Sequence, residues 1–263
     1  MKYVLVFLLL MYARANGQNP GPRLAAMGSG GAALSDVWSL QQNPAGIAEL
    51  KRPIVAIAYE RHFMDAEVST QNVVFVVPFR RNGIGLSLER YGINEFKEQI
   101  IGLNYAKGFG ESFRMAIGLK YYQLNILNYG SAKAVAIDAG FQLKVSDKFT
   151  IASHMANPSL SKYKSLQGSN LPARLTLGTA FRFSDRLSMI VDIRKYFRHP
   201  VDGMTGIEYN IMKWFSLRGG VSVNPFKQYT GFGINFNKMQ IDVSVASHPS
   251  LGYTPQVALG YEF

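Results

Sequence analysis

The sequence predicts an all-β fold: a 14-stranded antiparallel transmembrane β-barrel with a short N-terminal helical hatch, or plug, in its lumen. Three observations support this prediction. From residue 53 to the end, apolar and polar residues alternate with a period of two, as they do along a pleated strand. The body of the chain has no apolar run of the roughly 20 residues that a membrane-spanning helix needs. The stretch 27–50 is Gly-rich and then helix-like, and it does not alternate.

The alternating part of the chain divides into fourteen segments separated by turn residues. Each is close to the about 9–11 residues that a tilted transmembrane strand requires. An even number of strands closes an antiparallel sheet without an exposed edge. The predicted strands span residues 53–60, 68–79, 83–92, 95–107, 113–126, 132–146, 149–157, 172–184, 186–198, 201–213, 214–223, 228–238, 239–248 and 253–263.

The two faces of these segments differ in chemistry. In the segment 113–126, Met115 and Ile117 share one face, while Arg114 and Lys120 share the other. A soluble β-sandwich shows the same alternation with its apolar face inward. The composition of the polar face therefore has to distinguish the two folds. Charges of both signs, mixed with many glycines, favour a narrow lumen closed by ion pairs. The predicted lumen charges are Glu89, Arg114, Lys120, Asp138, Lys144, Arg174, Arg182, Asp192, Arg194, Glu208, Arg218, Asp242 and Glu262.

The connections predict the orientation of the barrel. Turns after the even-numbered strands are short, and each carries or adjoins a Lys or Arg, whereas the opposite loops are longer. Short periplasmic turns and longer outer loops are typical of outer-membrane barrels. We therefore expect the bacterial outer membrane, with the N- and C-termini periplasmic and with lipid and lipopolysaccharide around the wall. Aromatic residues near both ends of the strands predict two interfacial girdles.

The chain ends on an aromatic residue. The last predicted strand places Val257, Leu259, Tyr261 and Phe263 on the lipid face. Tyr261 and Phe263 resemble the C-terminal assembly signal that outer-membrane barrels present to the barrel-assembly machinery. That machinery is therefore an expected partner during biogenesis.

The first 17 residues predict a secretory signal peptide, because Lys2 precedes a short apolar core and small residues follow at the cleavage site. The expected organisation is a signal peptide over 1–17, the hatch over 18–51 and the outer-membrane barrel over 52–263. The absence of cysteine excludes disulfides and thiolate metal sites. The net charge of +11 is spread without a basic helix or dense cluster, so nucleic acid is not expected as a partner.

The local chemistry of the hatch predicts two short helical turns. We expect Ser35 to cap a helix from Asp36 to Gln42, which ends at Asn43 because the residue before a proline avoids the helical region. Asn43 then caps a second turn that Pro44 starts. The first two predicted strands are apolar on both faces, which indicates lipid on one side and the hatch on the other.

The sequence does not predict an enzyme. Its four histidines, His62, His154, His199 and His248, fall in or near the outer half of the predicted barrel, without an HxH or HExxH spacing. Nearby acids would permit hydrolysis or metal binding, but loop positions explain these histidines better. The glycines at 28–31 do not follow a strand and so do not form a nucleotide loop. No catalytic, cofactor-binding or metal site is predicted, and no cofactor.

The hatch also carries a family resemblance. Gly21-Pro22-Arg23, Met27-Gly28, Ala32-Ala33-Leu34, Asp36 and Asn43-Pro44-Ala45-Gly46 resemble the N-terminal hatch of the FadL superfamily, and most of all the PorV/PorQ-type proteins of Bacteroidota. The last loop, residues 248–255, is similar to that of the same group. The resemblance implies fourteen strands, a hatch on the periplasmic side and a hatch motif of Gly28, Asp36, Asn43, Pro44 and Gly46.

The resemblance implies two possible functions. The family includes transporters of hydrophobic compounds and accessory subunits of type IX secretion. Transporters of this family have long outer loops that form a capture groove, whereas most outer loops here are short. We therefore expect a non-enzymatic accessory or scaffold subunit of a larger outer-membrane protein complex, of the secretion or protein-export/assembly type. The alternative is a FadL-like passive transporter of hydrophobic small molecules across the outer membrane.

Overall fold

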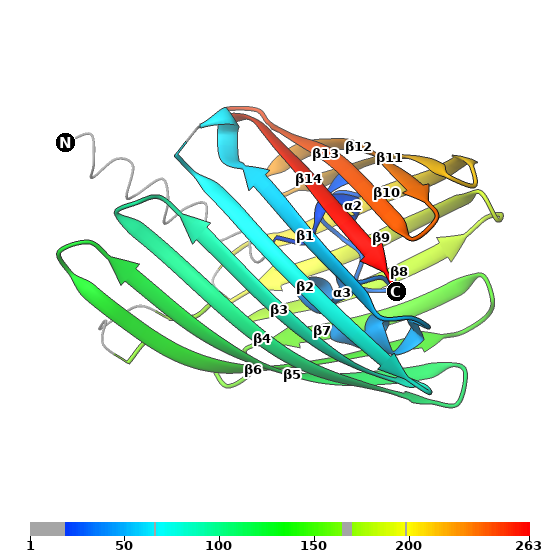
Figure 1. The fold of residues 1–263 in the computed structure, drawn as a ribbon, viewed down its shortest axis with the longest axis horizontal. Coiled ribbons are helices and arrows are strands. Elements are labelled where there is room, and N and C mark those ends of the chain that lie inside the picture. The colour runs from blue at the N-terminus through cyan, green and yellow to red at the C-terminus, as the bar shows by residue number, and fades with distance from the viewer. Residues whose placement is uncertain (1–18, 66, 165–169, 198) are drawn as a thin grey trace.

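The alternating part of the chain folds into one closed antiparallel barrel in the computed structural model, which describes residues 19–65, 67–164, 170–197 and 199–263 (Figure 1). Each strand pairs with its neighbours in the sequence, and the last strand pairs with the first. The predicted 14-stranded transmembrane fold is confirmed. The predicted signal peptide lies outside the described residues.

All fourteen predicted strands are present in the described chain, with ends that differ by a few residues. They are β1 (Ile54–Arg61), β2 (Ser69–Phe79), β3 (Asn82–Gly92), β4 (Phe96–Phe109), β5 (Phe113–Ile126), β6 (Gly130–Lys144), β7 (Phe149–Ala156), β8 (Arg174–Arg182), β9 (Leu187–Tyr196), β10 (Val201–Met212), β11 (Phe215–Val223), β12 (Phe226–Phe236), β13 (Met239–His248) and β14 (Gly252–Glu262).

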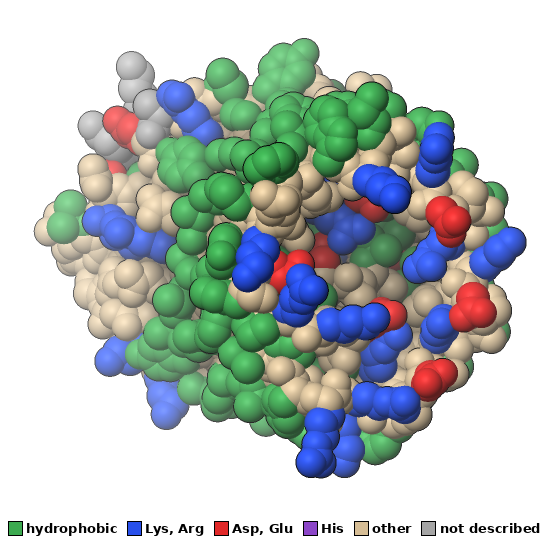
Figure 2. All heavy atoms as spheres, turned by 45° about the vertical axis from the view of Figure 1, so that its right-hand side comes forward, with side chains coloured by type: hydrophobic (Ala, Val, Ile, Leu, Met, Phe, Trp, Pro, Cys, Tyr) green, Lys and Arg blue, Asp and Glu red, His purple; other side chains and the backbone are tan. Residues whose placement is uncertain are grey.

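The alternation orients one face of every strand outward. On β5, Met115, Ile117 and Leu119 are exposed by 47%, 57% and 51%, while Arg114 and Lys120 are buried inside the barrel. Because the exposed side chains are apolar, a bilayer rather than water is the solvent that this surface fits. Figure 2 shows these apolar side chains over the wall, with Lys and Arg gathered around the end where the short turns lie.

The hatch fills the middle of the lumen with short helices. It contains α2 (Pro22–Ala26), α3 (Ser39–Gln42) and the 3₁₀ helix η2 (Pro44–Glu49), and a further 3₁₀ helix, η3 (His62–Met64), follows β1. Over the described residues, no helix is both long and apolar enough to cross a bilayer.

An apolar cluster joins the hatch to the first strands. Trp38, Leu40 and Ile47 of the hatch are almost fully buried against Ala56 and Val74 of β1 and β2. The prediction that the hatch covers the inner faces of these two strands is confirmed, and it explains why both of their faces are apolar.

The first described residue of the hatch lies towards the end of the barrel opposite to the C-terminus. The first described residue, Asn19, is hydrogen-bonded to Glu60 and Gln256, towards the outer-loop ends of β1 and β14. Phe263 donates its backbone N–H to Pro53 at the short-turn end. The sequence had predicted both termini on the periplasmic side, but the described chain places only its C-terminal residue at the short-turn end. The chain therefore crosses much of the lumen before β1 begins.

Candidate functional site

The hatch divides the lumen into two cavities. The outer cavity, about 730 Å³, meets the hatch at Asn19, Pro20, Ser29 and Gln42 and is otherwise lined by the outer halves of the strands and by residues of the outer loops. The inner cavity, about 610 Å³, meets the hatch at other residues, among them Arg23 and Asp36, and opens at the short-turn end. A solute in one cavity therefore has the hatch between it and the other.

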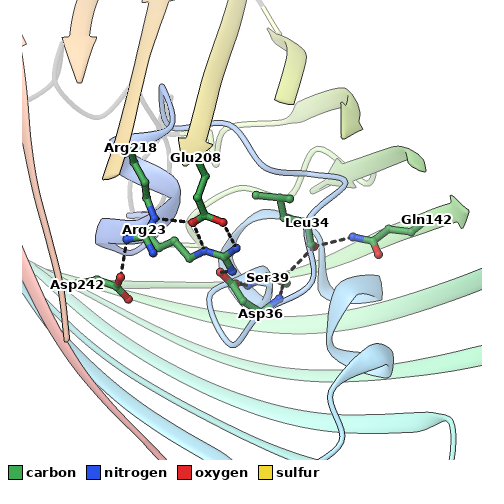
Figure 3. Close-up of polar contacts among 8 residues, drawn as sticks. All are labelled: Arg23, Leu34, Asp36, Ser39, Gln142, Glu208, Arg218 and Asp242. Carbon is green, nitrogen blue, oxygen red and sulfur yellow. Dashed lines mark hydrogen bonds and ion pairs between the residues drawn. The ribbon is translucent and has the colours of Figure 1, made fainter. Parts of the chain in front are cut away.

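An ion-pair cluster fixes the inner side of the hatch (Figure 3). Arg23 donates to both carboxylate oxygens of Glu208, at 3.0 and 2.9 Å, and to Asp36 at 3.0 Å. Arg218 donates to Glu208 at 2.6 Å and to Asp242 at 2.5 Å. Two parallel bonds from one guanidinium give both strength and a defined geometry. The Glu208 carboxylate raises the pKa of Arg23 above its ordinary value, so Arg23 stays charged.

A second attachment runs through two side-chain amides on the opposite side of the lumen. Asn43 donates to the carbonyl oxygens of Ala32, at 2.9 Å, and of Phe141 in β6, at 3.0 Å. Gln142 donates to Ala32 at 3.0 Å and to Leu34 at 2.8 Å. These bonds tie the backbone of the hatch to the barrel wall, so displacing the hatch would leave several polar groups unsatisfied.

Asn43 also caps the turn that Pro44 starts, because its Oδ1 accepts the N–H of Ala45 at 3.2 Å. This prediction is confirmed. The prediction that Ser35 caps the preceding helix is wrong. The helix begins only at Ser39, whose N–H donates to Asp36 at 3.0 Å, while the Ser35 hydroxyl donates to Gln142. The Asp36 carboxylate accepts the N–H group of Ser39, and the Ser35 hydroxyl is bonded to the barrel wall instead.

Glycines allow the backbone of the hatch to contact the backbone of the barrel wall directly. Gly28 has φ +78°, and a Cβ there would lie 2.7 Å from the Thr205 carbonyl oxygen of β10. On the wall, a Cβ at Gly220 would lie 2.3 Å from the Gly28 nitrogen. Within the hatch, a Cβ at Gly46 would lie 2.6 Å from the Leu34 carbonyl oxygen. Both glycines of the predicted hatch motif therefore lie where no side chain fits.

Basic side chains of β8 and β9 hold the outer side of the hatch. Arg194 donates to the Ser29 carbonyl oxygen at 2.8 Å and to Gln42 at 3.0 Å. Arg174 donates to the Gln41 carbonyl oxygen at 3.4 Å. The carboxylate of Asp192 accepts the backbone N–H groups of the hatch residues 31 and 32 at 2.7 and 2.9 Å. These wall charges are therefore used to hold backbone groups of the hatch.

A separate buried group lies between β5, β6 and β7. Lys120 pairs with Asp138 at 2.5 Å, and His154 lies 3.6 Å from the same carboxylate, with all three side chains about 1% exposed. Asp138 also accepts the N–H of Asn157 at 3.2 Å. His154 is thus buried in the wall and does not lie at a rim. Among the residues that the structure describes, no three His, Asp or Glu side chains come together as a metal site.

The predicted lumen charges do not form one network. Ten of them lie buried inside the barrel: Glu89, Arg114, Lys120, Asp138, Arg174, Asp192, Arg194, Glu208, Arg218 and Asp242. All but Glu89 and Arg114 belong to the groups described above. The other three lie at the short-turn end of the barrel: Arg182 is exposed at the end of β8, Lys144 pairs with Asp147 at 2.7 Å, and Glu262 pairs with Arg52 at 3.6 Å. The placement of these three in the closed interior was wrong, because each lies next to a short turn or the chain end, beyond the hatch.

Two residues that hold the hatch were not among the predicted lumen charges. Arg23 lies in the hatch, where it is part of the Gly21-Pro22-Arg23 resemblance, and Gln142 is a neutral residue of the wall. Gln142 does lie on the polar face of an alternating strand, which is the one signal that pointed inward.

An apolar patch lines one side of the outer cavity. Ile100, Tyr122 and Leu124, from the outer halves of β4 and β5, pack with Tyr163 and Leu171 of the segment between β7 and β8. Tyr163 donates to Glu98 at 2.5 Å, which fixes this segment over the cavity. The residues that form the patch are Phe96, Ile100, Tyr122, Leu124, Ala132, Ala134, Ala136, Tyr163 and Leu171, with Tyr91, Ile93 and Ile126 packed against them.

Fourteen strands closed around an N-terminal hatch define the class of this molecule, a plugged transmembrane β-barrel. No family model matches the sequence, and no curated protein matches it. Among solved structures, the toluene transporter TbuX of Ralstonia pickettii is similar, with 14% identity, a TM-score of 0.70 and coverage of 95% of this chain and 99% of the transporter.

Two further solved structures resemble the chain equally well. The toluene transporter TodX of Pseudomonas putida has 13% identity and a TM-score of 0.69, over 95% of this chain and 99% of that one. A FadL homologue of Pseudomonas aeruginosa has 12% identity and a TM-score of 0.69, over 92% and 98%. At such identities the likeness establishes the fold alone, that of FadL-type outer-membrane barrels. The narrower PorV/PorQ-type resemblance is not confirmed.

Proposed function

We propose that this protein is a passive channel for small hydrophobic compounds in the bacterial outer membrane. The observation that carries this proposal is the outer cavity of about 730 Å³ with an apolar patch on its wall. Ligand sites for small molecules typically have volumes of about 300–1,000 Å³ and largely apolar walls. A lumen that served only as a structural scaffold needs no such cavity.

The comparisons favour the same function. TbuX and TodX are described as toluene transporters, and a further similar structure, CymD, as a monoaromatic hydrocarbon channel. The fold that this chain shares with them therefore accommodates passage of apolar molecules. The alternative that the sequence offered is favoured over the scaffold role. A partner complex, and with it type IX secretion, stays a prediction from the hatch resemblance.

Passage through the lumen requires the hatch to move. It separates the two cavities and is held by the Arg23 cluster, by Asn43 and Gln142, and by Arg194. The strand pairs from β1 to β5 have continuous register, so the wall around the apolar patch has no gap there. A solute bound in the outer cavity therefore meets the hatch as the barrier to transport.

The proposed function is tested by uptake of radiolabelled toluene into intact cells of a host without its own channel of this type. Ala246→Trp fills the outer cavity from β13 and is expected to reduce uptake. Val245→Trp, one residue away on the opposite face of the same strand, is the matched control and keeps full uptake. Folding of each variant is checked by the shift in gel mobility on heating. Equal uptake with and without the wild-type barrel contradicts the proposal.

A further inference from the structure

Carboxylates alternate with the apolar side chains on one wall of the outer cavity. Glu89 of β3 lies directly opposite Ile100 of β4, which in turn lies opposite Tyr122 of β5. Glu98 of β4 lies opposite Tyr91 of β3 on one side and opposite Leu124 of β5 on the other. A molecule whose apolar body covers this wall therefore has a carboxylate next to it.

Glu89 is the least satisfied of these groups. Its side chain is buried, with 9% of the residue exposed, and it lines the outer cavity. Its Oε2 has no hydrogen-bond partner among the described residues. A buried carboxylate oxygen without a partner is costly, because the water it has lost is not replaced. A donor from a ligand in the cavity would remove that cost.

Three cations of the lumen are occupied by other groups, whereas Lys162, between β7 and β8, and Lys227 of β12 line the outer cavity as well. Arg174 and Arg194 donate to oxygen atoms of the hatch, at 3.4 Å for the former and at 2.8 and 3.0 Å for the latter. Lys120 is paired with Asp138 at 2.5 Å. The arginines also lie on β8 and β9, away from the patch on β3 to β5. An anionic head group on a ligand that lies on the patch would face Glu89 and Glu98, which repel it.

We propose that the outer cavity selects organic cations, that is, aryl or alkyl ammonium compounds, over neutral and anionic compounds of the same shape. The ammonium donates to the carboxylate of Glu89, and the apolar body lies on Ile100, Tyr122 and Leu124. Tyrosine rings next to the carboxylates add cation–π attraction. This inference rests on the proposed channel function and names the class of solute that the same cavity prefers.

The test uses three probes with one ring system and different head groups: 1-naphthylmethylamine, 1-methylnaphthalene and 1-naphthoate. Binding to the purified protein in nanodiscs of zwitterionic lipid is followed by naphthalene fluorescence, and entry into cells is measured as for toluene. The amine is expected to bind saturably and about tenfold more tightly than 1-methylnaphthalene, because a hydrogen bond with charged partners is stronger than a neutral contact. Naphthoate is expected to bind most weakly.

Two substitutions at position 89 separate charge from packing. Glu89→Gln keeps the shape and is expected to remove the tenfold preference for the amine while binding of 1-methylnaphthalene is unchanged. Glu89→Asp keeps the charge and is expected to retain a preference. Glu111→Gln, in an exposed turn at the other end of the barrel, is the control and changes nothing.

The outcomes distinguish this inference from the channel function. Entry of 1-methylnaphthalene without tighter binding of the amine overturns the cation preference and leaves the channel function intact. An amine preference that survives Glu89→Gln also overturns the inference, because the carboxylate would then not be its origin. Failure of all three probes to enter cells overturns the channel function itself.

Discussion

Replacing Arg23 by methionine should loosen the hatch. The substitution keeps a long side chain but removes the two bonds to Glu208 and the bond to Asp36. Removing one partner of a buried ion pair costs about 3–5 kcal/mol. Glu208 keeps its bond to Arg218 at 2.6 Å, so we expect the lower end, about 3 kcal/mol. If this free energy is lost only from the state in which the hatch is seated in the lumen, the ratio of displaced to seated hatch rises by about a hundredfold.

Single-channel recording in planar bilayers measures this ratio, because the hatch separates the two cavities and a displaced hatch lets ions through. The fraction of time in an open state should rise by about a hundredfold in Arg23→Met. Arg52→Met removes an exposed pair with Glu262, at 3.6 Å, and is expected to behave as wild type. An unchanged open fraction in a correctly folded Arg23→Met barrel would refute the reasoning. The hatch would then be held by its apolar cluster and by Asn43.

Three further substitutions probe the other attachments. Gly28→Val would place its Cβ 2.7 Å from the Thr205 carbonyl oxygen, at a positive φ that valine disfavours. The substitution should destabilise the seated hatch by about 1–3 kcal/mol, and increased protease cleavage of the hatch measures this change. Lys120→Met leaves the buried Asp138 without its cation, with only His154 and the N–H of Asn157 beside it, and should lower the free energy of unfolding in urea by about 3–5 kcal/mol, with little change in conductance. Pro44→Gly removes the fixed φ that starts η2 and should increase ion leak through the same bilayers, by less than Arg23→Met; equal conductance and stability would contradict this.

Much of the barrel followed from local sequence. A period of two puts alternate side chains on opposite faces, so Met115 and Lys120 could be assigned to different sides of β5 without knowing what either touches. Turn residues then gave the number of strands. The cap formed by Asn43 was equally local, because the donor it satisfies is only two residues away.

The site was less predictable, because its contacts join residues far apart in the chain. Arg23 and Glu208 are 185 residues apart, and Asn43 and Phe141 are 98 apart. Ser35 was misassigned for the same reason: a local pattern made it a helix cap, but Gln142 of the wall competes for its hydroxyl. Alternation predicts that a side chain lies inside the barrel, but it does not predict the position of that side chain along the barrel axis relative to the hatch.

The sequence by itself determined the class of fold, the number of strands, the face that meets lipid and the presence of a hatch, because each depends on the backbone period and on neighbouring residues. Only the tertiary structure decided how the hatch is seated, which charges pair, and that a cavity with an apolar patch and the buried carboxylate of Glu89 remains above it. The physical reason is that the sheet closes on itself to form a barrel. When β14 pairs with β1, the register around the ring fixes which inward side chains share a level, and that level decides whether a charge meets the hatch, another charge or an open cavity.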